Sequence, residues 1–276
     1  MGTSSSTALT TADKSKGGVS GAVETGGKTG RLVLAKCKLT RVPAEVWLLG
    51  DRLRSLDLSG NALENLTSQI GVLTKLQSLR LSCNALQELP MELIHLSELH
   101  TLLADHNKLH TVAAVLPRQK LKKLDLSYNA FEGEVGHPRL ALPPCTALAN
   151  LSHNRITGFA PSFGFEALQA LEELDIDDNA VQTLPPAVGE MTKLKCLKAR
   201  NNQLASVPSE IFAKTEIHLL QLDGNPITVG ILRETPGFDL FMARRAERIN
   251  KGISQGLHPD RSICGLADDV EREIKP

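Results

Sequence analysis

The stretch LRSLDLSGNAL at residues 53–63 recurs along the chain and decides the fold. Clear copies begin at positions 76, 99, 121, 171, 194 and 217, and a weaker copy begins at 146. Each copy ends its apolar pattern with an asparagine, and these residues are Asn61, Asn84, Asn107, Asn129, Asn154, Asn179, Asn202 and Asn225, spaced 22 to 25 residues apart. A repeated period of this length indicates a solenoid, in which each unit stacks on its neighbours.

The pattern LxxLxL predicts a short strand whose leucines point inward while the residues between them point outward. The asparagine amide can satisfy backbone groups that the following turn leaves open. A second apolar set in each repeat, such as Leu86, Leu89 and Leu93, closes the opposite side. A lone repeat cannot bury enough apolar surface to offset the entropy of ordering its backbone. We therefore expect stacked repeats with a cap at each end.

These features predict an α/β leucine-rich repeat solenoid. We expect a right-handed horseshoe with short parallel strands on its concave face and irregular, 3-10 or helical segments on its convex side. In the degenerate first repeat, Cys37 takes the asparagine position. The expected parts are a disordered tail at 1–20, an N-terminal cap and degenerate repeat at 21–52, eight repeats at 53–234, a capping helix at 235–253 and a flexible tail at 254–276.

Leu-Pro or Val-Pro pairs follow several asparagines, as at Leu89-Pro90 and Leu184-Pro185. This version of the repeat resembles the intracellular class related to Ras-pathway scaffolds and the Ras suppressor protein. The segments VETGGKTGRLVLAKCKLTRVPAEVW (23–47) and LDGNPITVGILRETPGFDLFMARRAERI (222–249) resemble the two ends of the leucine-rich repeat-containing protein 57 family. The resemblance covers roughly residues 20–253 and implies an architecture more than a biochemical activity.

Composition excludes some functions. The net charge is zero at pH 7, which argues against a nucleic-acid binder. Five widely spaced cysteines without a CxxC pair indicate a reducing compartment and no structural zinc site. With no signal sequence or long apolar run, we expect a cytoplasmic monomer. The start MGTSSS matches an N-myristoylation motif at Gly2, which predicts weak, reversible peripheral membrane contact.

Residues 22–29, AVETGGKT, nominally match a phosphate-binding loop. Such a loop needs a buried strand before it and a helix after it. Here a Ser/Thr/Gly tract precedes the segment and a strand, RLVLAKC, follows it. We interpret the segment as a turn that starts the N-terminal cap, and a nucleotide-binding enzyme is the alternative.

The outward strand positions predict a recognition surface on the concave face. Acidic residues crowd the strand at 173–177, and basic residues flank them in the next repeat, which suits a partner with a basic segment. His106, Tyr128 and His153 form a further column with capacity for hot-spot contacts. The residues predicted to bind protein are Asp105, His106, Asp125, Tyr128, Asn150, His153, Glu173, Asp175, Asp177, Lys198 and Arg200.

We predict a non-catalytic scaffold or adaptor for intracellular signalling, with no catalytic residue, cofactor or metal. A regulatory subunit of a phosphatase or small-GTPase pathway is the alternative within the same class. A shared metal at His106 and His153 is disfavoured because two strand spacings, roughly 10 Å, exceed the reach of zinc ligands.

Two irregular segments and the C-terminus complete the prediction. Residues 132–146 and 161–170 lengthen two repeats and are interpreted as loop variation, with a secondary docking site as the alternative. Thr235 and Pro236 predict a helix start. The expected helix packs Phe238, Phe241, Met242 and Ile249 against the last repeat and presents a basic outer side made of Arg244, Arg245, Arg248 and Lys251.

Overall fold

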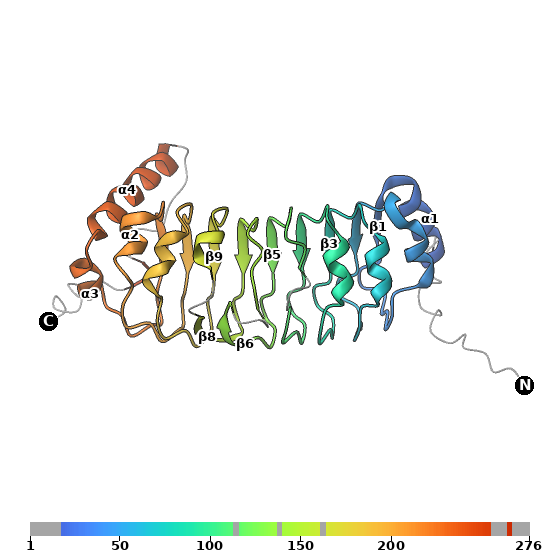
Figure 1. The fold of residues 1–276 in the computed structure, drawn as a ribbon, viewed down its shortest axis with the longest axis horizontal. Coiled ribbons are helices and arrows are strands. Elements are labelled where there is room, and N and C mark those ends of the chain that lie inside the picture. Colours follow the sequence, from blue (N-terminus) through green and yellow to red (C-terminus); the bar gives the residue numbers. More distant parts are fainter. Residues whose placement is uncertain (1–17, 113–115, 137–139, 161–163, 255–263, 267–276) are drawn as a thin grey trace, which may run out of the picture. The chain divides into compact units, whose positions relative to one another are not determined.

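The computed structural model describes residues 18–112, 116–136, 140–160, 164–254 and 264–266 (Figure 1). The chain divides into two compact units, Met1–Ala130 and Phe131–Pro276. Gly2 and most of the two predicted tails lie outside the described residues.

In the first unit, helix α1 (Val19–Thr29) precedes parallel strands separated by 3-10 helices, labelled η. Within the unit these elements are β1 (Arg31–Val33), η1 (Ala44–Arg52), β2 (Ser55–Asp57), η2 (Ser68–Val72), β3 (Ser78–Arg80), η3 (Met91–His95), β4 (Thr101–Leu103) and β5 (Lys123–Asp125). The strands pair in chain order, each with the next. Figure 1 shows the 3-10 helices side by side along the unit. The predicted α/β solenoid is confirmed.

A ladder of leucines forms the core of the first unit. The pairing register sets Leu32, Leu56, Leu79, Leu102 and Leu124 opposite one another. All of them are at most 1% exposed. Burying each side chain contributes roughly 1.5–3 kcal/mol, so the inward half of the LxxLxL pattern supplies much of the stability of the stack.

The repeated asparagines form a second ladder. Asn61 Nδ2 donates to the carbonyls of Leu34 at 2.9 Å and Leu58 at 2.7 Å. Its Oδ1 accepts from the backbone N–H groups of Cys37 and Leu39, both at 3.0 Å. Equivalent bonds recur at Asn84, Asn107 and Asn129. Each amide thus ties two successive turns together and provides partners for backbone groups in both.

The second unit contains a parallel sheet and a smaller pair of strands. The sheet consists of β7 (Leu148–Asn150), β9 (Glu173–Asp175), β10 (Cys196–Lys198) and β11 (Leu219–Gln221), paired in that order. The remaining elements are β6 (Glu132–Val135), β8 (Arg155–Phe159), η4 (Phe165–Ala167), η5 (Pro186–Glu190), α2 (Glu210–Lys214), α3 (Val229–Glu234) and α4 (Phe238–Ser254). Ala149, Leu174, Leu197 and Leu220 line up in register and are buried.

The first irregular segment is not only a loop. Its residues Glu132–Val135 form β6, which pairs in parallel with β8 and shifts register between Gly133 and Glu134. The pairing buries Val135 and Ile156. The prediction of loop variation throughout 132–146 is therefore wrong for its first residues. Residues 137–139 and 161–163 lie outside the described part of the chain.

The GGKT segment is helical, so its interpretation as a turn is wrong. It belongs to α1, which ends at Gly30 in a left-handed conformation with φ of 71°. A Cβ on Gly26 would lie 3.1 Å from Leu32 Cβ, and one on Gly27 would lie 3.2 Å from Leu49 Cδ2. Glycine therefore lets the helix approach the first repeat closely and cover its end.

The C-terminal helices differ from the prediction in three respects. Helix α3 ends at Glu234 and Thr235 caps its C-terminus, whereas α4 begins at Phe238. Arg244 faces inward, donating from Nε to the Ile217 carbonyl at 2.9 Å and from Nη2 to the Phe212 carbonyl at 2.7 Å. Arg245 is 7% exposed, so the basic outer side expected of this helix loses these two arginines.

The predicted C-terminal tail also contributes to the fold. Cys264 is buried, and its carbonyl accepts from the Leu222 N–H at 2.8 Å. Leu222 directly follows the last strand of the sheet, where the described chain has no further repeat to provide an acceptor for its N–H. The described residues 264–266 therefore cover part of the terminal repeat.

Candidate partner-binding surface

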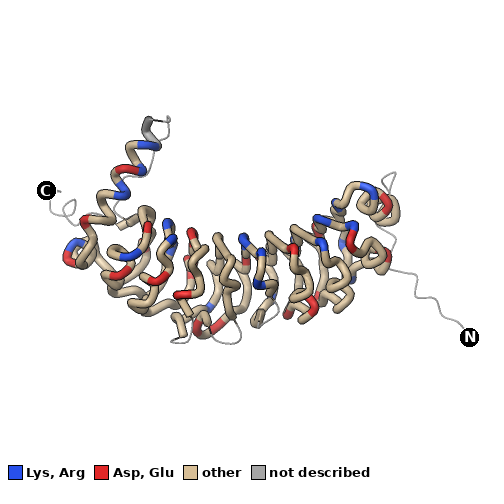
Figure 2. Tube along the Cα trace, turned by 45° about the horizontal axis from the view of Figure 1, so that its top comes forward, with Lys and Arg blue, Asp and Glu red and all other residues tan. Residues whose placement is uncertain are grey.

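In each unit, the outward side chains of the parallel strands form a surface that we call the strand face. The register confirms the predicted central columns, Val33, Asp57, Arg80, Leu103 and Asp125 in the first unit and Asn150, Asp175, Lys198 and Gln221 in the second. Acidic and basic positions lie interspersed within each unit (Figure 2). Each strand face therefore carries both positive and negative side chains.

The first unit brings an aromatic pair to its surface. The rings of His106 and Tyr128 stack with centroids 4.1 Å apart and an interplanar angle of 17°. The Tyr128 residue is 43% exposed and is the one tyrosine of the chain. Asp105 lies beside the pair, with Oδ2 3.1 Å from His106 Nδ1. Asp125 Oδ1 accepts from the N–H and hydroxyl of Ser127, which fixes that carboxylate.

The column of His106, Tyr128 and His153 occupies a special backbone position. The residue before each ladder asparagine has positive φ, and these residues are Gly60, Cys83, His106, Tyr128, His153, Asp178, Asn201 and Gly224. The left-handed conformation costs roughly 1–2 kcal/mol for a residue with a Cβ. It turns the chain out of the strand and leaves Tyr128 and His106 at the edge of the strand face.

In the second unit, the predicted acidic and basic residues neutralise one another. Lys198 Nζ lies 2.7 Å from Glu173 Oε1 and 3.4 Å from Asp175 Oδ2. Asp177 is 3% exposed and accepts from the Arg200 N–H and Nε, both at 2.7 Å. The basic residues predicted to flank the acidic ones therefore lie directly on those carboxylates as ion pairs.

Burial and pairing act against each other on these groups. Burial raises the pKa of Asp175, with the charge of Asp177 adding to the effect and Lys198 opposing it. Burial alone would lower the pKa of Lys198, but its hydrogen bond to Glu173 and the charge of Asp175 raise it. The network therefore holds a charged lysine over partly buried carboxylates.

The remaining predicted residues make local contacts. Asn150 Oδ1 accepts from the Ser152 N–H at 3.0 Å. His153 Nε2 lies 3.3 Å from Asp178 Oδ2, and the Asp178 Oδ1 accepts from Asn201 Nδ2 at 2.8 Å. Both histidines of the column thus have a carboxylate neighbour within their own unit.

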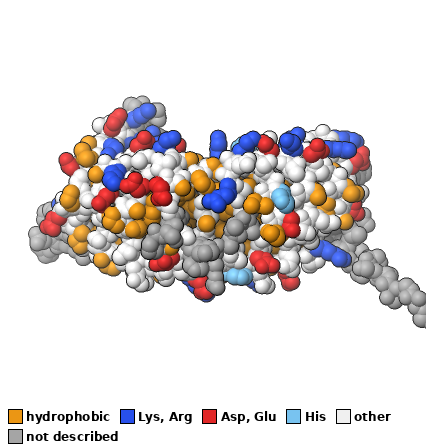
Figure 3. Space-filling view, in the orientation of Figure 1, with side chains coloured by type: hydrophobic (Ala, Val, Ile, Leu, Met, Phe, Trp, Pro, Cys, Tyr) orange, Lys and Arg blue, Asp and Glu red, His pale blue; other side chains and the backbone are white. Residues whose placement is uncertain are grey.

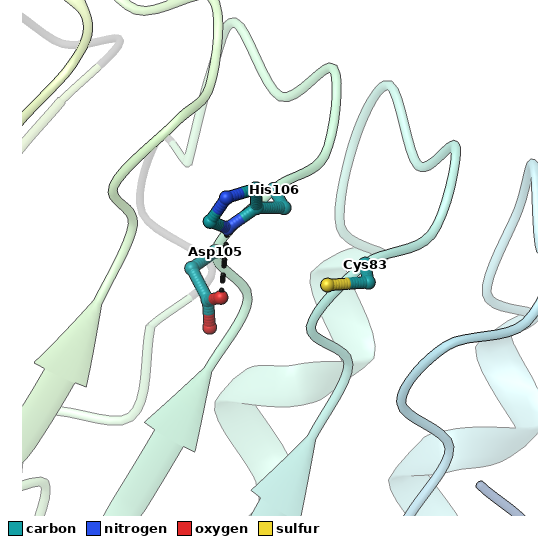
Figure 4. Close-up of side chains that lie close together, drawn as sticks. All are labelled: Cys83, Asp105 and His106. Atoms are coloured by element: carbon teal, nitrogen blue, oxygen red, sulfur yellow. Dashed lines mark hydrogen bonds and ion pairs between the residues drawn. The ribbon is translucent and has the colours of Figure 1, made fainter. Parts of the chain in front are cut away.

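Sequence reasoning missed Cys83 as a candidate site residue. Cys83 Sγ, a carboxylate oxygen of Asp105 and a ring nitrogen of His106 all lie within 4.8 Å of one another. Figure 4 shows the three side chains converging from neighbouring turns. Its position in the repeat could have identified it, because Cys83 and His106 each directly precede a ladder asparagine in adjacent repeats.

The geometry disfavours nucleotide binding at residues 22–29. The backbone there is helical, as in the Ala22 N–H bond to the Gly18 carbonyl at 3.1 Å, so it forms no phosphate cradle. Lys28 pairs with Glu24 at 2.7 Å. A groove beside the helix is lined by residues that include Thr25, Thr29 and Arg31 but not this lysine.

Exposed apolar side chains lie on the 3-10 helices of the first unit. They are Leu48, Val72, Met91 and Ile94. Apolar side chains in this unit are scattered among charged ones on the face drawn in Figure 3. In the described residues no helix is long and apolar enough to cross a bilayer.

Comparisons with known proteins agree with this geometry. Residues 51–109 match a family model described as leucine rich repeat, and residues 119–134 match a second model of that description. A leucine-rich repeat protein of Leptospira interrogans superposes with a TM-score of 0.61 at 28% identity, over 83% of this chain and 54% of that one. The chain has the leucine-rich repeat fold.

Two further leucine-rich repeat relatives are informative. Mouse podocan is 32% identical over 124 residues, which is 44% of this chain and 19% of podocan. The leucine-rich repeat ectodomain of the Arabidopsis thaliana receptor kinase GASSHO1/SCHENGEN3, in complex with CASPARIAN STRIP INTEGRITY FACTOR 2, has a TM-score of 0.50 at 28% identity, over 67% of this chain and 26% of that one. The chain thus spans about a fifth of podocan and about half of the Leptospira protein.

Proposed function

We propose that this chain is a non-catalytic scaffold that binds a protein partner on its strand face. The observation that carries the proposal is the exposed Tyr128 stacked on His106 at 4.1 Å. Tyrosine is enriched among residues that dominate binding energies because it combines apolar area with a hydroxyl group. Its stacked partner reduces the rotamer entropy lost when it binds.

The surroundings of Tyr128 fit a recognition role. Asp105 and Asp125 place carboxylates on the same strand face, and both are oriented by serine neighbours. A partner that presents an apolar patch next to a basic segment would match this arrangement. We therefore propose that the basic segment of the partner contacts the first unit.

In the second unit, we propose that the paired charges contribute to the specificity of partner binding. Lys198 and Arg200 are held on their carboxylates, so a partner meets fixed charges. Such a pattern favours specificity, since a misplaced charge on the partner would lack a counter-ion. We therefore assign the affinity chiefly to Tyr128 and its neighbours.

The comparisons support binding of a protein ligand. The Arabidopsis receptor ectodomain named above was solved in complex with CASPARIAN STRIP INTEGRITY FACTOR 2. That chain uses the same type of repeat, and partner binding is the usual role of such solenoid surfaces. The proposal for this chain rests on that analogy together with Tyr128.

The finer elements of the proposal concern location. We propose membership of the intracellular class, in signalling, on the Leu-Pro pattern of the repeats, and a myristoyl group on Gly2. Mass spectrometry of the chain expressed in eukaryotic cells should find that group on wild type and not on Gly2→Ala. An unmodified wild-type N-terminus would remove the membrane element and leave the scaffold role intact.

A position-specific cross-linking experiment tests the scaffold role. A photoreactive amino acid is placed at Tyr128 and, in a matched control, at Met91, which is 71% exposed on η3. A partner captured from cells at Tyr128 and not at Met91 is then purified. We expect Tyr128→Ala to weaken its binding at least about tenfold, and Met91→Ala to leave it unchanged. Equal capture at both positions, or unchanged binding by Tyr128→Ala, would refute the proposed surface.

A further inference from the structure

The cluster of Cys83, Asp105 and His106 combines three kinds of metal ligand at one surface point. The candidate atoms are a thiol sulfur, a carboxylate oxygen and an imidazole nitrogen, all within 4.8 Å of one another. In Figure 4 the Cys83 thiol points toward the other two side chains. All three residues belong to the first unit, so their separation is set within one compact body.

Backbone hydrogen bonds hold the two turns in register. The Cys83 N–H donates to the Asp105 carbonyl at 2.9 Å, and the Asn84 N–H donates to the His106 carbonyl at 3.2 Å. Cys83 and His106 share the left-handed conformation, with φ of 56° and 53°. The repeat therefore places a thiol and an imidazole at equivalent positions of adjacent turns, and a metal could be bound by side-chain movement alone.

Neighbouring side chains orient the ligands. The Ser82 hydroxyl donates to Asp105 Oδ1, which leaves Oδ2 directed at His106 Nδ1, 3.1 Å away. Tyr128 stacks on the imidazole and fixes its plane. Outer contacts of this kind set the orientation of metal ligands and raise the affinity of a site.

We propose that Cys83, Asp105 and His106 form a binding site for a divalent transition metal, most readily Zn²⁺. Thiolate, imidazole and carboxylate are the ligands of zinc, whereas Mg²⁺ and Ca²⁺ take oxygen ligands. Zinc bonds of about 2.0–2.3 Å place neighbouring tetrahedral ligands roughly 3.5 Å apart, so the side chains need to close by about 1 Å. The three protein ligands leave a coordination position for water.

The proposed site shares Asp105 and His106 with the proposed partner-binding surface. Binding requires the Cys83 thiol to lose its proton, so uptake of Zn²⁺ releases a proton and strengthens as the pH rises. The metal would replace the contact between Asp105 and His106. Zinc binding is measured on the isolated chain and does not depend on any partner.

The test titrates ZnCl₂ into the metal-free, reduced full chain in competition with a chromophoric chelator. We expect about one Zn²⁺ to bind with at least tenfold higher affinity to wild type than to Cys83→Gly or His106→Ala. Asp105→Asn should weaken binding while keeping an acceptor for Ser82. The matched control is Cys37→Ala, another cysteine of the first unit, which should bind like wild type.

Two features keep the result interpretable. Glycine occupies the equivalent turn position at Gly60 and Gly224, so Cys83→Gly should fold, as thermal unfolding would show. Co²⁺ provides a second readout, because a thiolate ligand gives a sulfur-to-cobalt charge-transfer band that Cys83→Gly should abolish. Equal zinc affinity in wild type and Cys83→Gly, absence of the band, or failure to bind Zn²⁺ at micromolar concentrations would overturn the proposal.

Discussion

Replacing Asp177 by alanine should destabilise the second unit far more than the same change at its neighbour Asp178. The Asp177 side chain is 5% exposed and accepts from both the backbone N–H and the guanidinium of Arg200. Losing the bond from the N–H to a carboxylate costs about 2 kcal/mol. Losing the ion pair adds about 1 kcal/mol, a reduced value because the Arg200 side chain is 41% exposed and regains water.

The expected total for Asp177→Ala is therefore about 3 kcal/mol. Asp177→Asn keeps an acceptor for the backbone N–H and should cost about half as much. The Asp178 side chain is 35% exposed, and its contacts are with His153 and Asn201. Alanine there should cost roughly 0.5 kcal/mol.

Urea unfolding followed by circular dichroism at pH 7 measures the three free energies of unfolding. Amide hydrogen exchange at Arg200 provides a local readout, since that N–H loses its acceptor only in Asp177→Ala. If Asp177→Ala and Asp178→Ala differed by less than about 0.5 kcal/mol, the assignment of Asp177 as a buried structural anchor would be wrong.

Three further outcomes are expected. Gly224→Ala should lower the free energy of unfolding by about 2–3 kcal/mol, because the added Cβ would meet the Asn201 backbone 3.1 Å away. Gly60→Ala should lower it by only about 1 kcal/mol, because the added Cβ there would meet a lysine side chain that can move. Burial, helped by nearby arginine and lysine charges, lowers the pKa of His218 below 6.5. Its contribution to stability is complete above pH 6.5 and is lost as the pH falls through the folded pKa, so His218→Gln should flatten the acid limb of a stability–pH profile. Cys83→Gly should raise the melting temperature, because glycine adopts the positive φ of 56° without the steric cost of a Cβ. The net gain in stability is roughly 0.5–1 kcal/mol after the entropy cost of glycine is subtracted. A lower melting temperature would contradict this reasoning.

The parts of the fold that follow the period could be predicted from the sequence. One register, repeated every 22 to 25 residues, fixes which side chains face inward and which column each outward residue joins. The central columns through Asp57 and Asp175 are therefore found as predicted. Periodicity carries this information because every strand has the same neighbours.

Features that depend on side-chain conformation or on a departure from the period could not be predicted. The columns placed Asp177 and Arg200 near one another but gave no means to tell a solvated carboxylate from one that is 3% exposed. The glycines of the GGKT segment indicated a turn, whereas close packing against Leu32 explains them within a helix. Arg244 was assigned to the solvent side by helical spacing alone, but two carbonyls of the preceding repeat accept its hydrogen bonds.

The row of left-handed residues is where the sequence departs most from what the fold alone requires. Gly60 and Gly224 show that the repeat accepts glycine there, yet Cys83, His106 and Tyr128 keep a side chain in a conformation that penalises a Cβ. Residues held in such a conformation point to function when their side chains serve no core. Tyr128 is exposed and stacked, and Cys83 and His106 converge on one carboxylate. Both proposals for the first unit therefore rest on the same row, in which stability is traded for the placement of an aromatic group, a thiol and an imidazole at the surface.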